Sequence, residues 1–171
     1  MQVVKKTVLI LFVIGFAFIV CMPKRHFYYR AEQILASEGI KINEKRIDEG
    51  FFTLTIEDAV VYVQGIDLIH IASAQLTSLL FYTDIVLKDV QLDDSLASMA
   101  PTSLRSITLK HTLFSPKEVA ISGEGDFGVF QGNIDIASRT IHIDFEETAR
   151  LGALKRQLKK GEKGFYYEKS F

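Results

Sequence analysis

Apolar residues recur at every second position over most of the chain after Gly39, and this alternation constrains the fold more than any other feature. In the stretch 52–57, for example, Phe, Leu and Ile alternate strictly with Thr, Thr and Glu. Successive side chains of a strand point to opposite faces of a sheet, so a period of two predicts strands with one buried face. Turn signals between the runs favour antiparallel neighbours. We therefore expect a mainly β domain, either a twisted antiparallel open sheet or a β-jellyroll-like arrangement.

The alternation changes parity once, at Asp58, and the surrounding pattern recurs at Asp89. Both segments, 56–61 and 87–92, read apolar-x-Asp-apolar-x-apolar. An inserted residue re-aims the faces of a strand, so each Asp predicts a β-bulge or a tight bend. A single pair of similar segments does not establish an internal repeat.

The other expected strands follow from the same pattern. The segment 72–81 is compatible with a strand or a helix, and we interpret it as a strand. The segment 93–102 is polar and contains proline, which indicates a loop. The expected strands cover 66–71, 72–81, 82–92, 104–114, 118–127, 134–136, 141–145 and a final short strand at 165–168.

Two segments show a helical period. In 27–38, Phe27, Ala31, Ile34 and Leu35 share one helical face, and Gly39 follows at the position that favours a left-handed residue. The aromatic residues at its start suit either a membrane interface or a protein core.

The second predicted helix covers 146–160. Its leucines form one stripe, and its basic residues crowd the carboxyl end, where they complement the helix dipole. The ordinary role of these charges is solvation, although anionic headgroups would also suit them.

The stretch 7–22 contains sixteen residues without a charge and is flanked by Lys5, Lys6, Lys24 and Arg25. A bilayer core requires about 20 apolar residues, with a lower bound of roughly 17. We expect an uncleaved membrane anchor over 1–26, followed by a single domain over 27–171. A cleaved secretory signal and a buried soluble helix remain alternatives.

Long domains cross a membrane largely regardless of their charge, so we expect the domain to lie outside. In a bacterium this means a single-pass inner-membrane protein with a periplasmic domain. Lys24, Arg25 and Arg30 oppose that orientation, because positive charge normally stays in the cytoplasm.

Composition excludes several classes of function. The net charge is −1, which gives no electrostatic footprint for nucleic acid. The single cysteine, Cys21, lies in the apolar stretch, so the expected domain is stabilised without a disulfide.

The sequence offers no catalytic, cofactor-binding or metal-binding set. The four histidines are His26, His70, His111 and His142, and no two have the spacing that places ligands on one helical face. His142 alternates with Asp144, so both can share a strand face, but two residues do not make a metal site. The glycines at 123–128 lack the lysine and helix of a phosphate loop. We predict a non-enzymatic protein without a cofactor.

Two groups of residues carry a resemblance to known families. The stretch 51–81, with its alternating run, glycine, second strand and leucine-rich end, resembles the first β unit of type II secretion system protein N and of AsmA-like membrane-anchored proteins. The later segments 126–128 (DFG) and 132–136 (GNIDI) are also similar. The resemblance implies a periplasmic, membrane-anchored, open β-sheet with an apolar concave face. A protein of the lipopolysaccharide transport bridge is similar in architecture.

The sequence thus leads to two expectations about function. The first is a component of a secretion or transport assembly, similar to type II secretion, that acts through contacts with other envelope proteins. The alternative is a lipid-binding or lipid-transfer module. That alternative requires an apolar groove, lined by residues such as Leu54, Ile56, Val61 and Ile107.

Overall fold

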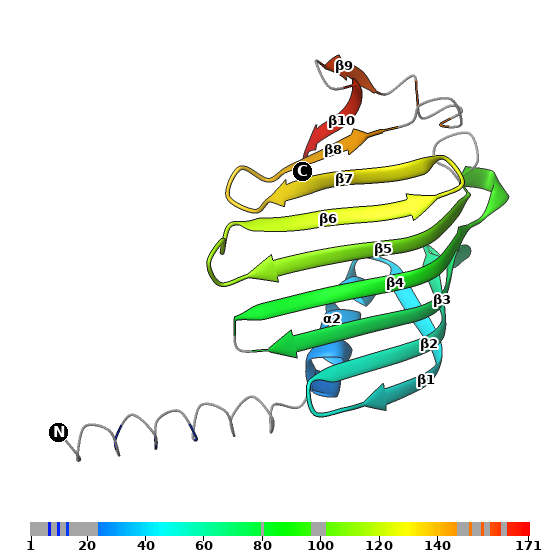
Figure 1. Ribbon diagram of the computed structural model, residues 1–171. Helices are drawn as coiled ribbons and strands as arrows, with labels where there is room; N and C mark the ends of the chain where they lie inside the picture. Colours follow the sequence, from blue (N-terminus) through cyan, green and yellow to red (C-terminus); the bar gives the residue numbers. More distant parts are fainter. Residues whose placement is uncertain are drawn as a thin grey trace.

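One antiparallel sheet of ten strands forms the body of the protein (Figure 1). The computed structural model describes residues 7, 10, 13, 24–79, 81–96, 102–146, 151, 155, 158–161 and 164–171. The strand order is β1-β2-β3-β4-β5-β6-β7-β8-β10-β9. This confirms the predicted mainly β, open antiparallel sheet. Because neighbours in the sheet are almost always neighbours in sequence, the sheet is a meander and not a jellyroll.

Most strands match the alternating runs, and residues 72–79 of the ambiguous segment belong to a long third strand. The prediction is wrong at 128–136, where one strand runs from Gly128 to Asp135 in place of the short strand expected at 134–136. The strand bounds are β1 Ile40–Glu49, β2 Thr53–Val63, β3 Ile66–Leu79, β4 Tyr82–Leu92, β5 Ser103–Thr112, β6 Glu118–Gly125, β7 Gly128–Asp135, β8 Thr140–Phe145, β9 Lys159–Gly161 and β10 Gly164–Ser170. A short 3-10 helix, Asp94–Leu96, begins the connection between β4 and β5.

The parity change at Asp58 is a local distortion of the strand, as predicted. Asp58 has φ 51° and Asp89 has φ 50°, both in the left-handed region. Asp58 and Asp89 lie on either side of Ala72 of β3. Ala59, which follows Asp58, pairs with Ile71, and Ile71 pairs with Val90, which follows Asp89. Both Asp side chains are exposed. The distortion lets the apolar residues before and after each Asp face the same side of the sheet.

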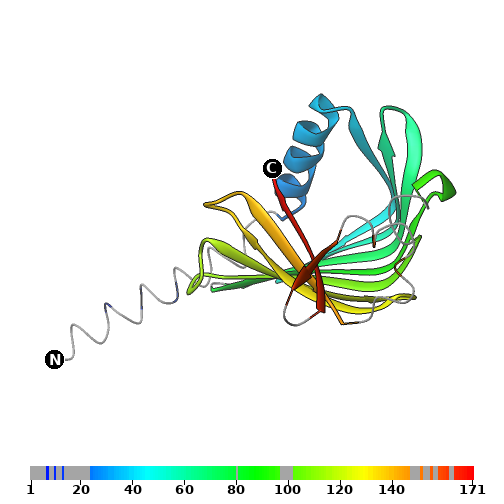
Figure 2. The ribbon, with the colours of Figure 1, turned by 90° about the horizontal axis from the view of Figure 1, so that it is seen from above.

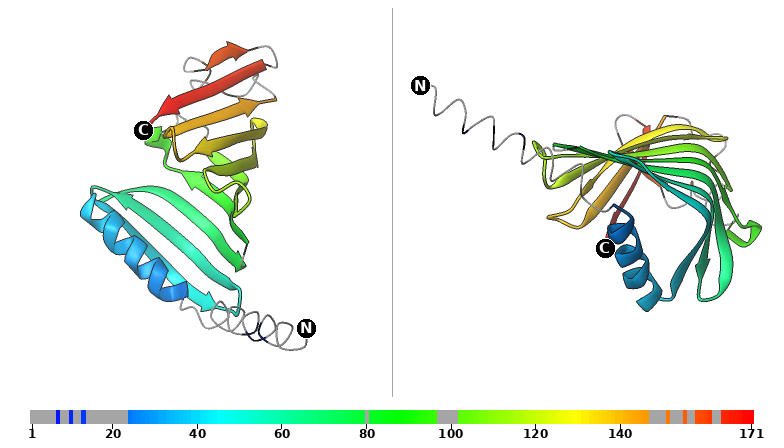
Figure 3. Two further views of the ribbon diagram at one scale, coloured as in Figure 1. Left: turned by 90° about the vertical axis from the view of Figure 1, so that its left-hand side faces the viewer. Right: turned by 90° about the horizontal axis from the view of Figure 1, so that it is seen from below.

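The sheet is strongly curved, and the helix α2, Lys24–Ser37, lies on its concave side (Figure 2). The helix packs against β1 and β2 (Figure 3). Glu49 at the end of β1 accepts hydrogen bonds from the backbone N–H of Lys24 (2.9 Å) and of Arg25 (3.5 Å), which satisfies two free donors at the helix start. Gly39 follows the helix with φ +79°, which confirms the predicted helix and its end.

The other half of the concave face is filled by a compact aromatic cluster. Phe127, Phe130, Phe145 and Leu151 are each less than a tenth exposed. The rings of Phe127 and Phe130 are stacked, with centroids 5.8 Å apart. Gly123 and Gly125 on β6 have no side chain, which leaves room for the rings of Phe130 and Phe127, respectively.

The predicted helix over 146–160 is wrong at its carboxyl end. Leu151 and Leu158 are not helical, and Lys159 and Lys160 belong to β9, which pairs with β10. Leu151 is buried in the aromatic cluster and Leu158 packs against it. Of the predicted leucine stripe, Leu151 is therefore buried and Leu158 half-buried, although neither residue is helical. Residues 147–150, 152–154, 156 and 157 lie outside the described residues.

Most of the apolar stretch 7–22 also lies outside the described residues. Thr7, Ile10 and Val13 are helical. Among the residues that are described, no helix is both long enough and apolar enough to cross a membrane.

Candidate functional site

An apolar groove of about 450 Å³ separates α2 from the concave faces of β2, β3 and β4. Its volume lies within the usual range of pockets for small organic ligands, about 300–1,000 Å³. Among the described residues that line it, none carries a charge. They are Phe27, Tyr28, Ala31, Ile42, Leu54, Ile56, Ala59, Val61, Ile71, Ala74, Gln75, Leu76, Ile85 and Leu87.

The helical wall of the groove contains part of the apolar face that the sequence predicts, namely Phe27 and Ala31 but neither Ile34 nor Leu35, and this face is not packed into a core. Tyr28, Glu32 and Leu35 are the half-buried residues of α2. Phe27, on the predicted apolar face, is 56% exposed and lines the groove together with Ala31. The helix therefore contacts the sheet through the side that carries Tyr28, Glu32 and Leu35. Most of its predicted apolar face is exposed.

The sheet wall is closed at its base and open above β3 and β4. Leu54 and Ala59 are buried, at 1% and 4% exposure. Ile85 on β4 lines the same groove and is 38% exposed. Because α2 packs against β1 and β2, the apolar residues that β3 and β4 contribute to this face are left without a cover from the helix.

Two polar residues border the groove, Tyr28 and Gln75. The Tyr28 hydroxyl is buried and makes no hydrogen bond of ordinary geometry with the described residues. Burial, followed by the nearby carboxylate of Glu44, raises the pKa of Tyr28 well above its ordinary value. The hydroxyl therefore stays protonated and can donate a hydrogen bond.

The predicted groove residues are largely confirmed. Leu54, Ile56 and Val61 line the groove. Ile107 does not, because it packs against the aromatic cluster in the other half of the sheet. The alternation shows which side chains share a face, but the position of α2 determines which part of that face stays open.

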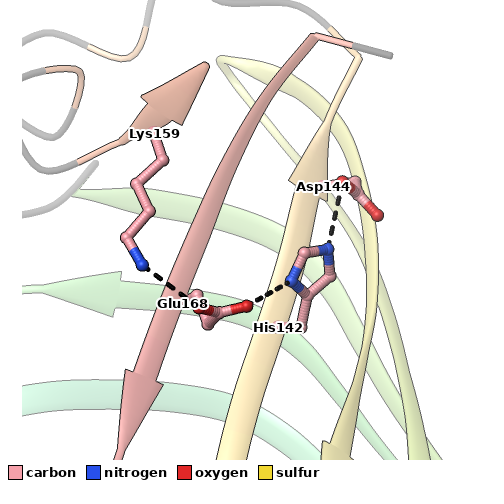
Figure 4. Close-up of polar contacts among 4 residues, drawn as sticks. All are labelled: His142, Asp144, Lys159 and Glu168. Atoms are coloured by element: carbon pink, nitrogen blue, oxygen red, sulfur yellow. Dashed lines mark hydrogen bonds and ion pairs between the residues drawn. The ribbon is translucent and has the colours of Figure 1, made fainter. Parts of the chain in front are cut away.

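His142 and Asp144 do share a strand face, and they join a charged network on β8 and β10 (Figure 4). His142 Nε2 lies 3.3 Å from Asp144 Oδ1, and its Nδ1 lies 3.4 Å from Glu168 Oε2. Glu168 also accepts a hydrogen bond from Lys159 (3.1 Å), which lowers the pKa of Glu168 and raises that of Lys159.

The geometry of this network suits an ion-pair network better than a catalytic or metal site. The imidazole lies between the two carboxylates, with one ring nitrogen directed to each, and its ring stacks on Tyr166 with centroids 5.0 Å apart. Glu168 could not be anticipated from sequence, because its place beside His142 depends on the pairing of β10 with β8.

The other histidines lie apart from one another. His70 pairs with Asp67 (3.1 Å), His111 contacts the carbonyl of Pro116 (3.2 Å), and His26 lies on α2. His70 also borders a hollow of about 200 Å³ on the outer face, between Asp58 and Asp89. Within the described part of the chain, no group of three potential ligands is arranged to hold a metal ion.

The groove is therefore the feature of this structure best suited to bind a ligand. Comparison with protein-family models, with curated proteins and with solved structures found no match to this chain.

Proposed function

We propose that this protein is a membrane-anchored, non-enzymatic module that binds a lipid acyl chain in the groove between α2 and β2–β4. The observation that carries the proposal is the uncharged lining of a groove that remains accessible between a helix and a curved sheet. An apolar ligand would bury the exposed parts of Phe27 and Ile85, which the protein itself leaves in contact with water.

The hydrophobic effect is large enough to support such binding. Each buried methylene contributes about 0.8 kcal/mol, so ten methylenes would contribute roughly 8 kcal/mol. Ordering the ligand and restricting its motion cost at least ~4 kcal/mol, which still leaves a favourable balance.

A membrane anchor formed by 7–22 is part of the proposal. An anchored groove would meet lipid at the bilayer surface without diffusion through water. A domain that faces the periplasm of a bacterium, held by a single span, remains our expectation for its location.

A photoactivatable fatty acid provides the test. We expect the full chain to be labelled at residues of the groove. Ala74→Phe should fill the groove and lower labelling at least tenfold, which corresponds to ~1.4 kcal/mol. Ala120→Phe is the matched control, because Ala120 is exposed on β6, away from the groove. Mass spectrometry of the labelled peptides would contradict the proposal if the label lay elsewhere or if both variants reacted like the natural chain.

A role in a secretion or transport assembly is the second candidate. The observation that favours it is β1, the last strand at one end of the sheet, which leaves an edge for pairing with another chain. Six of the ten residues of β1 are charged, which discourages indiscriminate pairing and favours a partner with complementary charge. Photo-crosslinking from Asn43 in intact cells should trap an envelope protein, and recovery of the free monomer alone would argue against this role.

A further inference from the structure

Four hairpin connections lie at one edge of the sheet, which we call the tip edge. Because the strands alternate in direction, the β1–β2, β3–β4, β5–β6 and β7–β8 connections all reach the left-hand side of the sheet in Figure 1. The described residues of these connections are 50–52, 81, 113–117 and 136–139. The β2–β3, β4–β5 and β6–β7 connections lie at the opposite edge.

Large apolar side chains project from every connection at the tip edge. Phe51 is 75% exposed, Phe81 51%, Phe114 86% and Ile136 51%. Leu113 and Leu79 beside them are also exposed. The rings of Phe81 and Phe114 are in contact, with centroids 6.2 Å apart. Such exposure is unfavourable in water, and a row of it marks an interaction surface.

Backbone hydrogen bonds join the connections into a continuous row. The N–H of Ser78 donates to the carbonyl of Phe52 (2.8 Å), that of Leu113 to Phe81 (3.0 Å) and that of Ile136 to Lys117 (2.8 Å). At the far end, the N–H of Phe171 donates to Arg139 (2.9 Å), and Phe171 is itself 64% exposed. The backbone that carries these apolar side chains is therefore held in place along one side of the domain.

Charge distinguishes the two edges. The tip-edge connections contain Lys117 and Arg139, and the strand ends beside them carry Glu49, Glu118 and Asp135. Two of these carboxylates accept backbone hydrogen bonds: Glu49 from Lys24 and Arg25, and Asp135 from Ala137 and Ser138. The opposite-edge connections contain three aspartates, Asp93, Asp94 and Asp126, and no lysine or arginine. A negatively charged surface would therefore be repelled more strongly by the opposite edge than by the tip edge.

The apolar stretch 7–22 joins the domain at this same edge. Lys24 begins α2, is 5% exposed and donates a hydrogen bond through Nζ to the carbonyl of Phe51 (2.6 Å). Arg25 donates to the carbonyl of Ile47 (3.0 Å). Met22 ends the apolar stretch only two residues before Lys24, and two residues span at most about 7 Å. Lys24, which follows the predicted anchor closely in sequence, therefore lies beside the first aromatic residue of the tip edge.

We propose that the tip edge is a membrane-contact surface, which inserts its aromatic and aliphatic side chains at the boundary between headgroups and acyl chains of an anionic bilayer. Lys117 and Arg139 then lie at the level of the lipid phosphates. Together with the anchor, this contact fixes the domain upright, with its strands running away from the membrane. The proposal is independent of the groove and stands if the groove binds no lipid.

Fluorescent labels on the two edges test this placement. The full chain with Cys21→Ser receives a single environment-sensitive label at Ser115→Cys on the tip edge or at Ser95→Cys on the opposite edge. In vesicles of phosphatidylcholine and phosphatidylglycerol, spin-labelled lipid should quench the label at position 115 several-fold more than the label at 95. Combined Phe51→Ser, Phe81→Ser and Phe114→Ser substitutions should abolish that difference.

Ile66→Ser is the matched control, since Ile66 is 61% exposed but lies at the opposite edge. It should leave the quenching unchanged. Equal access of aqueous iodide to positions 115 and 95 in these vesicles would overturn the proposal. If position 115 is protected from iodide only in native membranes, a protein partner covers the tip edge instead of lipid. If the protection depends on the protein-to-lipid ratio, a second copy of this chain covers it.

Discussion

Two aspartates mark the points where β2 and β4 bend. Asp58 and Asp89 occupy the left-handed region in mid-strand, where most residues other than glycine are unfavourable by about 1–2 kcal/mol. Aspartate tolerates this conformation better than most residues. Each one keeps apolar residues on both sides of it facing the groove, so a conformation that is unfavourable for one residue allows the burial of several others.

Asp89→Val should lower the free energy of unfolding by about 1–2 kcal/mol, because a β-branched residue is poorly accommodated at φ 50°. Asp89→Asn tolerates the same conformation and should change stability by less than ~0.5 kcal/mol. Asp89→Gly removes the strain but adds backbone entropy of similar size, ~1 kcal/mol, and should be nearly neutral. Urea unfolding of the full chain in detergent measures all three, and equal effects of Val and Asn would refute this account.

At this scale the sequence was informative. The parity change at Asp58 and its echo at Asp89 predicted both distortions. The register is the same on both sides of each Asp, so each distortion is a bend and not an inserted residue. The network around His142 was only half predictable. Asp144 lies two residues away on the same strand, whereas Glu168 arrives through strand pairing that no local pattern encodes.

The two halves of the concave face are covered by different means. The helix α2 covers one half loosely and leaves a groove. In the other half, Leu151 packs into the cluster of Phe127, Phe130 and Phe145. The two halves of one sheet thus differ in function, since one is the structural core and the other is the candidate ligand site.

Leu151→Ala should destabilise the protein by about 2–5 kcal/mol, because the side chain is 2% exposed and its removal leaves a cavity among aromatic rings. For a chain of this length, each kcal/mol lowers the melting temperature by roughly 2–4 °C. Ile66→Ala, at an exposed position, should cost less than ~0.5 kcal/mol. Thermal unfolding followed by circular dichroism compares them. Similar melting temperatures would mean that Leu151 is not part of the core.

The helix expected over 146–160 shows why element type was harder to predict than burial. The spacing of Leu151 and Leu158 is compatible with one helical stripe. Both leucines contact the cluster without being helical, and Lys159 and Lys160 pair with β10 as part of β9. Local periodicity is a weak predictor where tertiary pairing competes with it.

At the scale of the whole molecule, the open antiparallel sheet was predictable and the open groove was not. Alternation assigns Ile56, Leu76 and Leu87 to the inner face. It contains no information on how far α2 covers that face, because the cover depends on where Glu49 caps the helix and where Gly39 ends it. The tip edge was not predictable from the sequence either. Its phenylalanines are distant in the chain, and they come to one edge only because every second connection of the meander lies at that edge.

The strand order has a consequence for how the chain reaches its native state. Nearly every strand pairs with the strand just before it, and most of the connections are short, so closing each hairpin costs little loop entropy. Folding can therefore proceed from β1 toward β8, one hairpin at a time. The aromatic cluster and the pairing of β10 with β8 come last, so the half of the sheet that carries the groove can assemble before the half that stabilises it.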